Sequence, residues 1–350
     1  MDRSKRKMEH IQHALATNEQ KTNSFDEIRF VPNGLPNIYY GNSSLDTDLA
    51  SLRLSSPILI NAMTGGAAST ERINQKLAII ARERGLAMAV GSQMAALRDP
   101  SVRDSYSIVR KENPRGIIFA NIGAEATVEQ AQAAVEMLEA DGLQIHLNVM
   151  QELLMPEGDR DFTGYAEQIQ RIQDRVRVPV LVKEVGFGMA KETIRKLIEI
   201  GIPMIDVGGR GGTNFAKVEN LRRGKPLPMF DEWGLTTVES LLETREWINH
   251  RVAFVATGGV RHGLDVAKAL TLGASAVGIA GGFLRLVQTL SIEEALHAVD
   301  EWHHELRITM TALGVSRVED FSRVPLVFSG DVCKYAQQRK IDLSEWANRD

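Results

Sequence analysis

Polar side chains interrupt one short run of the sequence that otherwise reads as a buried strand. The run "QIHLNVMQE" spans residues 144–152. Because successive side chains of a strand point to opposite faces, Gln144, His146 and Asn148 share one face and the apolar residues between them share the other. Strands inside a parallel sheet are normally apolar on both faces. An imidazole and two amides on an inner face therefore predict contact with a ligand rather than with a dry core.

Two more polar side chains, Gln151 and Glu152, follow where this strand is expected to end. A glutamate there could hold Mg²⁺ through a carboxylate oxygen, with a substrate phosphate completing the coordination shell. His146 has no second histidine at metal-ligand spacing, so the pattern does not predict a zinc site. A hydrogen-bonded histidine of the core is the alternative for His146, and Asn148 on the same face argues against it.

Lys183 is a further unusual residue, because it lies among valines in "VPVLVKEVG" (178–186). A lysine in a buried strand needs an anionic or polar partner. The adjacent Glu184 would face the opposite side of the strand, which disfavours a simple ion pair between the two side chains. Lys183 could form a Schiff base, but the amides expected nearby fit a heterocycle with several hydrogen-bonding edges better.

The elements that must position these residues can be read from the hydrophobic pattern. Eight apolar, strand-like runs recur at fairly even spacing, at residues 57–66, 86–93, 116–124, 143–152, 178–186, 204–212, 252–260 and 275–283. Segments with helical periodicity lie between them, such as the one in which Thr127 is a predicted N-cap and Gln130 completes a capping box. Eight alternating units predict a single closed (β/α)₈ TIM barrel. A doubly wound open sheet is the alternative, but "AMTGGAAS" lacks the expected G-x-G-x-x-G fingerprint.

The expected domain organisation is an N-terminal extension over residues 1–50 and a (β/α)₈ barrel over residues 51–350. One connection after the sixth strand, residues 210–235, is unusually long. Long loops in compact domains are usually lids or binding loops. The basic run "RSKRK" near the N-terminus allows two interpretations, which are a solvated tail and a clamp on an anionic substrate.

Active sites of such barrels lie at the carboxyl ends of the strands. Small and polar residues collect there, namely Ala62, Met63, Thr64, Ser92, Gln93, Asn121, His146, Asn148, Lys183, Thr213, Gly258, Gly259, Ala280 and Gly281. The glycines after the seventh and eighth strands predict a phosphate site, because barrels bind phosphate at this place with backbone N–H groups. Tight turns that require glycine are the alternative.

Composition and charge exclude several classes of function. The net charge of −4 over 350 residues provides no overall basic field that would recruit nucleic acid. The charged N-terminus lacks the apolar segment of a signal peptide, and no apolar run is long enough for a membrane span. Cys333 is the single cysteine, so an internal disulfide is ruled out and a reducing compartment is expected. The expected location is the cytoplasm.

Six motifs in chain order together resemble the type 2 isopentenyl-diphosphate Δ-isomerases. They are "AMTGG", "GSQ", "HLNVMQE", "VKEVGFG", "GGRGGTNF" and "ATGGVR", and "RKMEH" extends the resemblance to the N-terminus. The resemblance implies a (β/α)₈ enzyme of isoprenoid biosynthesis that interconverts isopentenyl and dimethylallyl diphosphates without net redox change. It also implies reduced FMN, NADPH as the reductant, Mg²⁺, and a homo-oligomer that is a tetramer or larger.

The resemblance assigns roles to individual residues. Expected contacts to FMN are Ala62, Met63, Thr64, Ser92, Asn121, Lys183 and Thr213, with Gly258, Gly259, Ala280 and Gly281 at its phosphate. Expected contacts to substrate are Arg6, Lys7, His10, Ser92, Gln93, His146, Asn148 and Gln151. Glu152 would hold Mg²⁺, while Gln151, Lys183 and His146 would be the catalytic residues. The match to "RKMEH" favours the clamp interpretation of the basic run.

Moving a double bond by one carbon requires one proton to be added and another to be removed. Gln151 has no useful pKa for this task, and no aspartate or glutamate is obvious on the inner face of the barrel. Lys183 beside the ring could stabilise an anionic reduced flavin. The resemblance implies that the reduced flavin is the acid–base group.

Related oxidoreductases are the alternative class. An FMN-dependent α-hydroxy-acid oxidase would carry a histidine just before "GGR", whereas this chain has Val207 and Gly208 before the second glycine. An IMP dehydrogenase-like enzyme would need a loop cysteine, and Cys333 lies beyond the eighth strand. A binding protein without catalysis would leave the polar inner face around His146 unexplained.

Overall fold

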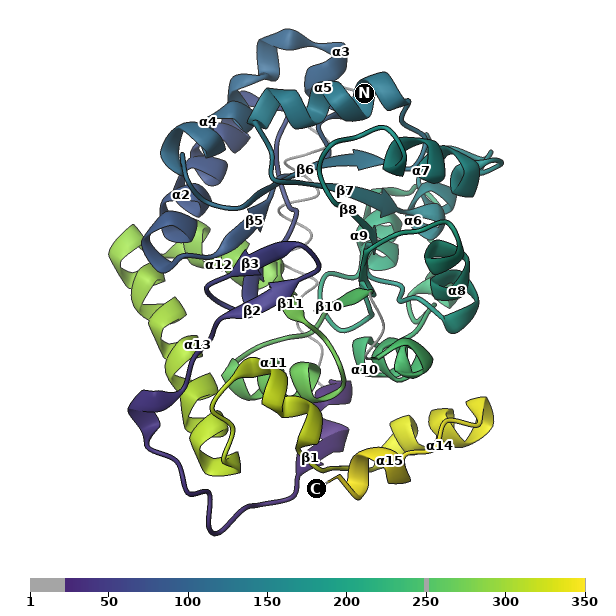
Figure 1. Cartoon of the computed structure of the whole chain (residues 1–350). Coiled ribbons are helices and arrows are strands. Elements are labelled where there is room, and N and C mark those ends of the chain that lie inside the picture. Colours follow the sequence, from purple (N-terminus) through teal and green to yellow (C-terminus); the bar gives the residue numbers. More distant parts are fainter. Residues whose placement is uncertain (1–22, 249–251, 350) are drawn as a thin grey trace.

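Eight parallel strands close into a barrel, which confirms the predicted fold (Figure 1). The computed structural model describes residues 23–248 and 252–349. The barrel strands are β4 (Ile58–Ile60), β5 (Ala87–Ala89), β6 (Ile118–Gly123), β7 (Gly142–Leu147), β8 (Val180–Glu184), β9 (Met204–Asp206), β10 (Ala253–Thr257) and β11 (Ala276–Ile279). Each predicted strand run overlaps one of them, and β11 pairs with β4 to complete the ring.

Helices follow every barrel strand and pack around the outside of the barrel (Figure 1). They are α2 (Ala68–Arg84), α3 (Met94–Arg98), α4 (Asp104–Glu112), α5 (Val128–Leu138), α6 (Val149–Leu154), α7 (Tyr165–Gln173), α8 (Lys191–Glu199), α9 (Phe215–Arg222), α10 (Thr237–Glu243), α11 (Gly263–Thr271), α12 (Gly281–Thr289) and α13 (Ile292–Leu313). The chain ends with α14 (Gly330–Arg339) and α15 (Ser344–Ala347). Within the described ranges, none of the helices combines the length and apolar character that a membrane crossing needs.

The start of α5 shows how local sequence sets an element boundary. Thr127 Oγ1 accepts a hydrogen bond from the Gln130 N–H at 3.3 Å, and Gln130 Oε1 accepts one from the Thr127 N–H at 2.9 Å. This reciprocal pair satisfies two N–H groups that have no partner inside the helix. The predicted capping box is confirmed.

A hairpin of two short strands, β2 (Thr47–Leu49) and β3 (Leu52–Leu54), covers the amino-terminal end of the barrel. Leu49 and Leu54 are buried in one apolar cluster with barrel-strand residues that include Leu59 and Phe119. The boundary expected after residue 50 falls in the turn of this hairpin. Farther from the barrel, β1 (Ile28–Phe30) pairs antiparallel with β12 (Leu326–Phe328).

The long connection after β9 is folded rather than extended. It contains α9 and the 3₁₀ turn η4 (Pro228–Phe230). Asn214 caps α9 by accepting from the Lys217 N–H at 3.0 Å and donates to the Asp231 carbonyl at 2.7 Å. Ala216 on α9 packs with Leu154 of α6 in a small apolar cluster, so this connection lies against the elements that follow β7.

Candidate active site

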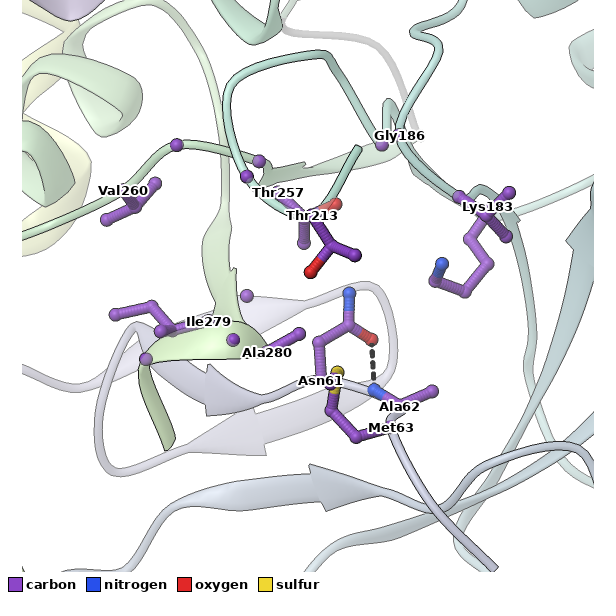
Figure 2. Close-up of a pocket in the computed structure, with 18 of the residues that line it drawn as sticks. Asn61, Ala62, Met63, Lys183, Gly186, Thr213, Thr257, Val260, Ile279 and Ala280 are labelled. Atoms are coloured by element: carbon purple, nitrogen blue, oxygen red, sulfur yellow. Dashed lines mark hydrogen bonds between the residues drawn. The ribbon is translucent and has the colours of Figure 1, made fainter. Parts of the chain in front are cut away.

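A cavity of about 560 Å³ lies at the carboxyl ends of the barrel strands, where the sequence predicted the site (Figure 2). All eight strand ends or the loops after them contribute to its wall. Every residue expected to contact FMN lines it, namely Ala62, Met63, Thr64, Ser92, Asn121, Lys183, Thr213, Gly258, Gly259, Ala280 and Gly281. His146 and Gln151, which were expected to contact the substrate, line the same cavity.

The polar run at the end of β7 is divided between a strand and a helix. β7 ends at Leu147 and Asn148 is the N-cap of α6, so Gln151 and Glu152 lie on a short helix. Gln144 is buried and donates to Asn61 Oδ1 at 3.1 Å. Gln144 of β7 therefore binds a side chain at the end of β4 across the barrel, whereas His146 and Gln151 face the cavity.

His146 is held as a neutral ring. Its Nδ1 lies 2.9 Å from Asn121 Oδ1, and the Asn121 amide is oriented by its own donation to the Val90 carbonyl at 2.9 Å. Because an amide oxygen only accepts, Nδ1 of His146 carries the proton and Nε2 is left as an acceptor. Burial and the charge of Lys183 lower the pKa of His146 to about 4, so the ring is uncharged at pH 7.

Lys183 is the buried cation of the cavity, with 6% of its surface exposed. Its Nζ donates to the Glu184 carbonyl at 2.7 Å, and among the described residues no carboxylate lies within ion-pair distance of it. The Glu184 side chain instead accepts from the N–H groups of Val185, Gly186 and Phe187 at 2.6–2.7 Å. Burial raises the pKa of Glu184 to about 7. The side chains of residues 183 and 184 form no ion pair, as their positions on the strand predicted.

The expectation that the inner face carries no carboxylate was wrong. Asp206 at the end of β9 is fully buried. Its Oδ1 accepts from Thr257 Oγ1 at 2.6 Å and from the Gly208 N–H at 3.0 Å, while Oδ2 accepts from Asn61 Nδ2 at 2.9 Å. The pKa of Asp206 is raised, because the effect of burial exceeds the lowering by the charge of Lys183 and by these hydrogen bonds. Asn61 and Thr257 line the cavity. The hydrogen bonds from these two side chains to Asp206 therefore hold the carboxyl ends of β4 and β10 in place.

A second carboxylate that the sequence did not reveal is Glu219 on α9, which reaches the cavity through Gln151. Gln151 Nε2 donates to Glu219 Oε1 at 2.9 Å, and Glu219 is fully buried. Arg222 pairs with Glu219 and also with Glu157. The carboxylate therefore orients and polarises the Gln151 amide. Only a folded connection after β9 brings residues 151 and 219 together, so no local pattern could indicate this pair.

The glycines after β10 and the start of α12 form a concave backbone surface. Gly258 has φ +106°, and a Cβ atom at this position would lie 1.9 Å from the Gly209 carbonyl oxygen, so glycine is required. Gly259 and Gly281 follow the adjacent strands β10 and β11 and line the same cavity. The first N–H groups of a helix have no partner within it and favour anions. This glycine cradle (Gly258, Gly259 and the Gly281 end of α12) fits a phosphate group.

Several predicted residues lie away from the cavity wall. Gln93 is buried behind it, with Nε2 donating to the Ala134 carbonyl at 3.0 Å. Asn148 donates to Glu152 Oε1 at 2.7 Å, and Glu152 Oε2 accepts from the Asp159 N–H at 2.9 Å. In the described part of the chain, no group of three or more His, Cys, Asp or Glu residues is arranged to hold a metal ion. Arg6, Lys7 and His10 lie outside the described residues.

Comparison with known proteins decides the family. The family model described as FMN-dependent dehydrogenase matches residues 94–327. The chain is 51% identical to isopentenyl-diphosphate delta-isomerases from Geobacillus sp. and Bacillus mycoides, over 100% of this chain and 100% of each relative. This chain belongs to the isopentenyl-diphosphate delta-isomerases. The isomerase family that the six motifs resembled is thereby confirmed, and the oxidoreductase alternative has no comparable support.

Solved structures share the fold of this isomerase family at low sequence identity. A flavocytochrome b2 variant matches with a TM-score of 0.68 and 17% identity, covering 98% of this chain and 84% of that chain. A mandelate oxidase variant with an FMN adduct matches with a TM-score of 0.63 and 15% identity, covering 91% and 92%. At such identities these matches show the barrel fold alone.

Proposed function

We propose that this isomerase interconverts isopentenyl and dimethylallyl diphosphates with reduced FMN held in the cavity at the carboxyl ends of the strands. One observation carries the proposal, which is that the glycine cradle and the polar groups of Lys183, His146 and Gln151 line a single cavity. The relatives named isopentenyl-diphosphate delta-isomerase, identical at 51% of positions over the full length, support the choice of reaction.

The residues present fit FMN. A cavity of about 560 Å³ lies in the range of sites that hold cofactors of this size. Ala62 and Met63 offer apolar surface to a flat ring, Asn121 and Thr213 offer hydrogen bonds to its edges, and the glycine cradle offers N–H groups to a phosphate. When bound in its reduced form, FMN would supply the proton donor and acceptor that the isomerisation needs.

The chain would supply charge, orientation and polarisation around that ring. Lys183 places a cation beside it, which favours the anionic reduced form. His146 is neutral at pH 7, so it would accept a hydrogen bond from a bound ligand through Nε2 rather than act as a cation. Gln151, polarised by the buried carboxylate of Glu219, would assist one proton transfer.

The diphosphate of the substrate requires positive charge. We propose Glu152 as the residue that holds Mg²⁺ on the diphosphate, and Arg6, Lys7 and His10 as direct contacts to it. Glu152→Gln should then raise the Mg²⁺ concentration needed for half-maximal activity and leave the flavin spectrum unchanged. Deleting residues 1–10 should raise KM for isopentenyl diphosphate much more than it changes FMN affinity. Unchanged values in either experiment would remove the corresponding residues from the diphosphate site.

The role of the flavin can be tested by counting electrons. NADPH is proposed only as the reductant of FMN, so one reduction should support many turnovers and NADPH consumption should not follow product. Replacement of FMN by 5-deazaFMN should stop the reaction, because the nitrogen that would hold the proton is lost. Full turnover with oxidised FMN or with the deaza analogue would show that the acid and base must be sought among His146, Glu152, Glu219 and Asp206. An oxidoreductase of the α-hydroxy-acid oxidase type would instead consume one oxidant per product.

Two further properties stay predictions. The homo-oligomer of four or more subunits can be measured by light scattering of the purified chain, and the cytoplasmic location by fractionation of cells.

A further inference from the structure

Among the described residues, four charged side chains other than histidine line the cavity, namely Lys183, Glu184, Arg261 and Arg285. Lys183 is proposed to lie beside the flavin ring, and the Glu184 carboxylate is bound by three backbone N–H groups. Arg261 and Arg285 follow the two strands whose ends form the glycine cradle, β10 and β11. Their partners differ, and the difference indicates which of the two guanidinium groups is available to a ligand.

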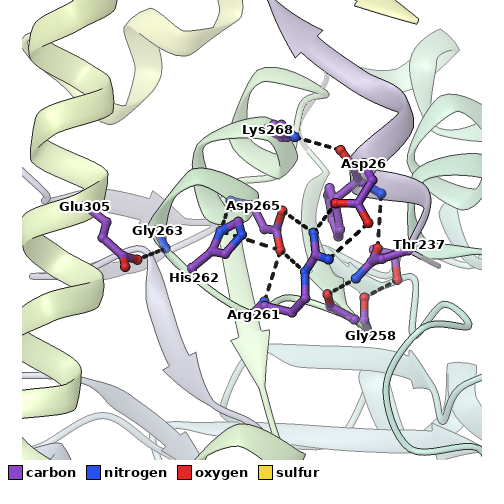
Figure 3. Close-up of polar contacts among 12 residues, drawn as sticks. Asp26, Thr237, Gly258, Arg261, His262, Gly263, Asp265, Lys268 and Glu305 are labelled. Carbon is purple, nitrogen blue, oxygen red and sulfur yellow. Dashed lines mark hydrogen bonds and ion pairs between the residues drawn. The ribbon is translucent and has the colours of Figure 1, made fainter. Parts of the chain in front are cut away.

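Arg261, in the motif "GGVR", is already neutralised (Figure 3). Its Nε donates to Asp265 Oδ2 at 2.8 Å, and one of its terminal nitrogens donates to Asp26 Oδ1 at 2.6 Å. Asp265 is fully buried, and the two carboxylates raise the pKa of Arg261. Next to it, the Asn23 side-chain amide donates to the Gly259 carbonyl. Arg261 therefore joins the segment at residues 23–26 to the loop after β10. The carboxylates of Asp26 and Asp265 offset its positive charge.

Among the residues that the structure describes, no carboxylate pairs with Arg285. It lies on α12, four residues after Gly281, so both residues share one face of the helix. Helical side chains lean towards the N-terminus of their helix, which directs this guanidinium towards the glycine cradle. Its side chain is exposed and lines the cavity, and among the described residues its guanidinium has no hydrogen-bond or ion-pair partner.

We infer that Arg285 binds the 5′-phosphate of FMN at the open side of the glycine cradle. This inference rests on the proposed placement of the flavin in the cavity. Backbone N–H groups and the N-terminus of α12 offer only partial positive charge to a phosphate dianion. A guanidinium adds a full charge and two parallel N–H donors with the geometry that phosphate oxygens accept. The diphosphate of the substrate presents the same chemistry, so an experiment must separate the two.

Riboflavin is the probe that isolates the phosphate, because it has the ring of FMN and lacks this group. Affinities of FMN and riboflavin for the full-length, flavin-free chain can be measured by quenching of flavin fluorescence. Arg285→Met should weaken FMN binding about tenfold or more, as expected for a charge-assisted pair to phosphate, and leave riboflavin affinity unchanged. Added salt should weaken FMN binding less in this variant than in the parent chain. Arg285→Lys should restore part of the loss.

Matched variants keep the result interpretable. Arg171→Met removes an exposed arginine of α7 far from the cradle in sequence and should change neither affinity. Arg261→Met should weaken both flavins to a similar degree, because it disturbs the loop rather than the phosphate. Equal effects of Arg285→Met on FMN and riboflavin, or no effect on either, would overturn the inference. So would a raised KM for isopentenyl diphosphate with unchanged FMN affinity, since that result places the guanidinium on the substrate. A parent chain that does not prefer FMN to riboflavin would overturn the flavin placement as well.

Discussion

The two ends of the barrel are built from the same eight strands but carry opposite chemistry. At the carboxyl ends, Asn121, His146 and Lys183 line a cavity and leave polar atoms for a ligand. At the amino ends, the β2–β3 hairpin covers an apolar cluster in which Leu49 is fully buried. The difference shows that the amino-terminal end of the barrel contributes to the stability of the fold, because apolar surface is buried there. The other end keeps desolvated polar groups that reduce stability in exchange for binding.

Loss of Lys183 is expected to have the largest effect on function. Lys183→Ala should abolish activity, by a factor of about a thousand or more, and weaken FMN binding, because the buried cation beside the ring disappears. The matched control is Lys268, which is also buried, does not line the cavity, and donates from Nζ to the Phe25 carbonyl at 2.7 Å. Lys268→Ala should lower the melting temperature and leave FMN affinity unchanged. Full activity of folded Lys183→Ala would remove this residue from the mechanism.

Substitutions at the amino-terminal end of the barrel, under the β2–β3 hairpin, should change the free energy of unfolding rather than kcat. Leu49→Ala should lower the free energy of unfolding by about 2–5 kcal/mol, because it removes buried methyl groups and leaves a cavity. Denaturant unfolding measures this change, and kcat of the folded fraction should equal that of the parent chain. A loss of kcat without a loss of stability would show that the two ends are coupled.

Breaking the Gln151–Glu219 pair at the cavity is expected to lower activity less than the loss of Lys183. Glu219→Gln should lower kcat about tenfold to a hundredfold, as expected when a polarising group of an acid–base site is lost. Glu243 is the control, since it is also a buried carboxylate and is bound by Arg339 and Tyr335 on α14. Glu243→Gln should affect unfolding only. Equal kcat values for the two variants would assign Glu219 a purely structural role.

The smallest expected effect concerns two histidines at opposite ends. The pKa of His146 is lowered to about 4, and burial lowers the pKa of His303, which lies 2.9 Å from Ser56 Oγ before β4, to about 4 as well. Between pH 6.5 and pH 4 the unfolded chain binds protons that the folded chain excludes, so stability falls as the pH falls. Replacing either histidine by glutamine should remove about 1 kcal/mol per pH unit of this slope. Unfolding measured at several pH values checks this, and only His146→Gln should also change turnover.

Local sequence patterns determined the fold and the end of the barrel at which the cavity lies. Strand and helix periods, the Thr127 capping box and the glycines at strand ends are properties of short segments, and the structure confirms the barrel that they predicted. Since all carboxyl ends of a parallel barrel meet on one side, residues such as Asn121, Lys183 and Gly258 could be placed in one cavity without coordinates. The isomerase family also followed from motifs that the comparisons bear out.

Tertiary structure alone decided which polar groups satisfy one another and which remain available. Asp206 ends a strand of three residues, too short for its face to be read, and only the closed ring brings Asn61 and Thr257 to its carboxylate. Gln151 meets Glu219 because the connection after β9 folds back. Arg261 lies in the motif "ATGGVR" that the sequence singled out, yet the fold gives that residue two carboxylates. In the described part of the chain, no carboxylate pairs with Arg285. Such pairings depend on distances between segments far apart in the chain, which no local pattern contains.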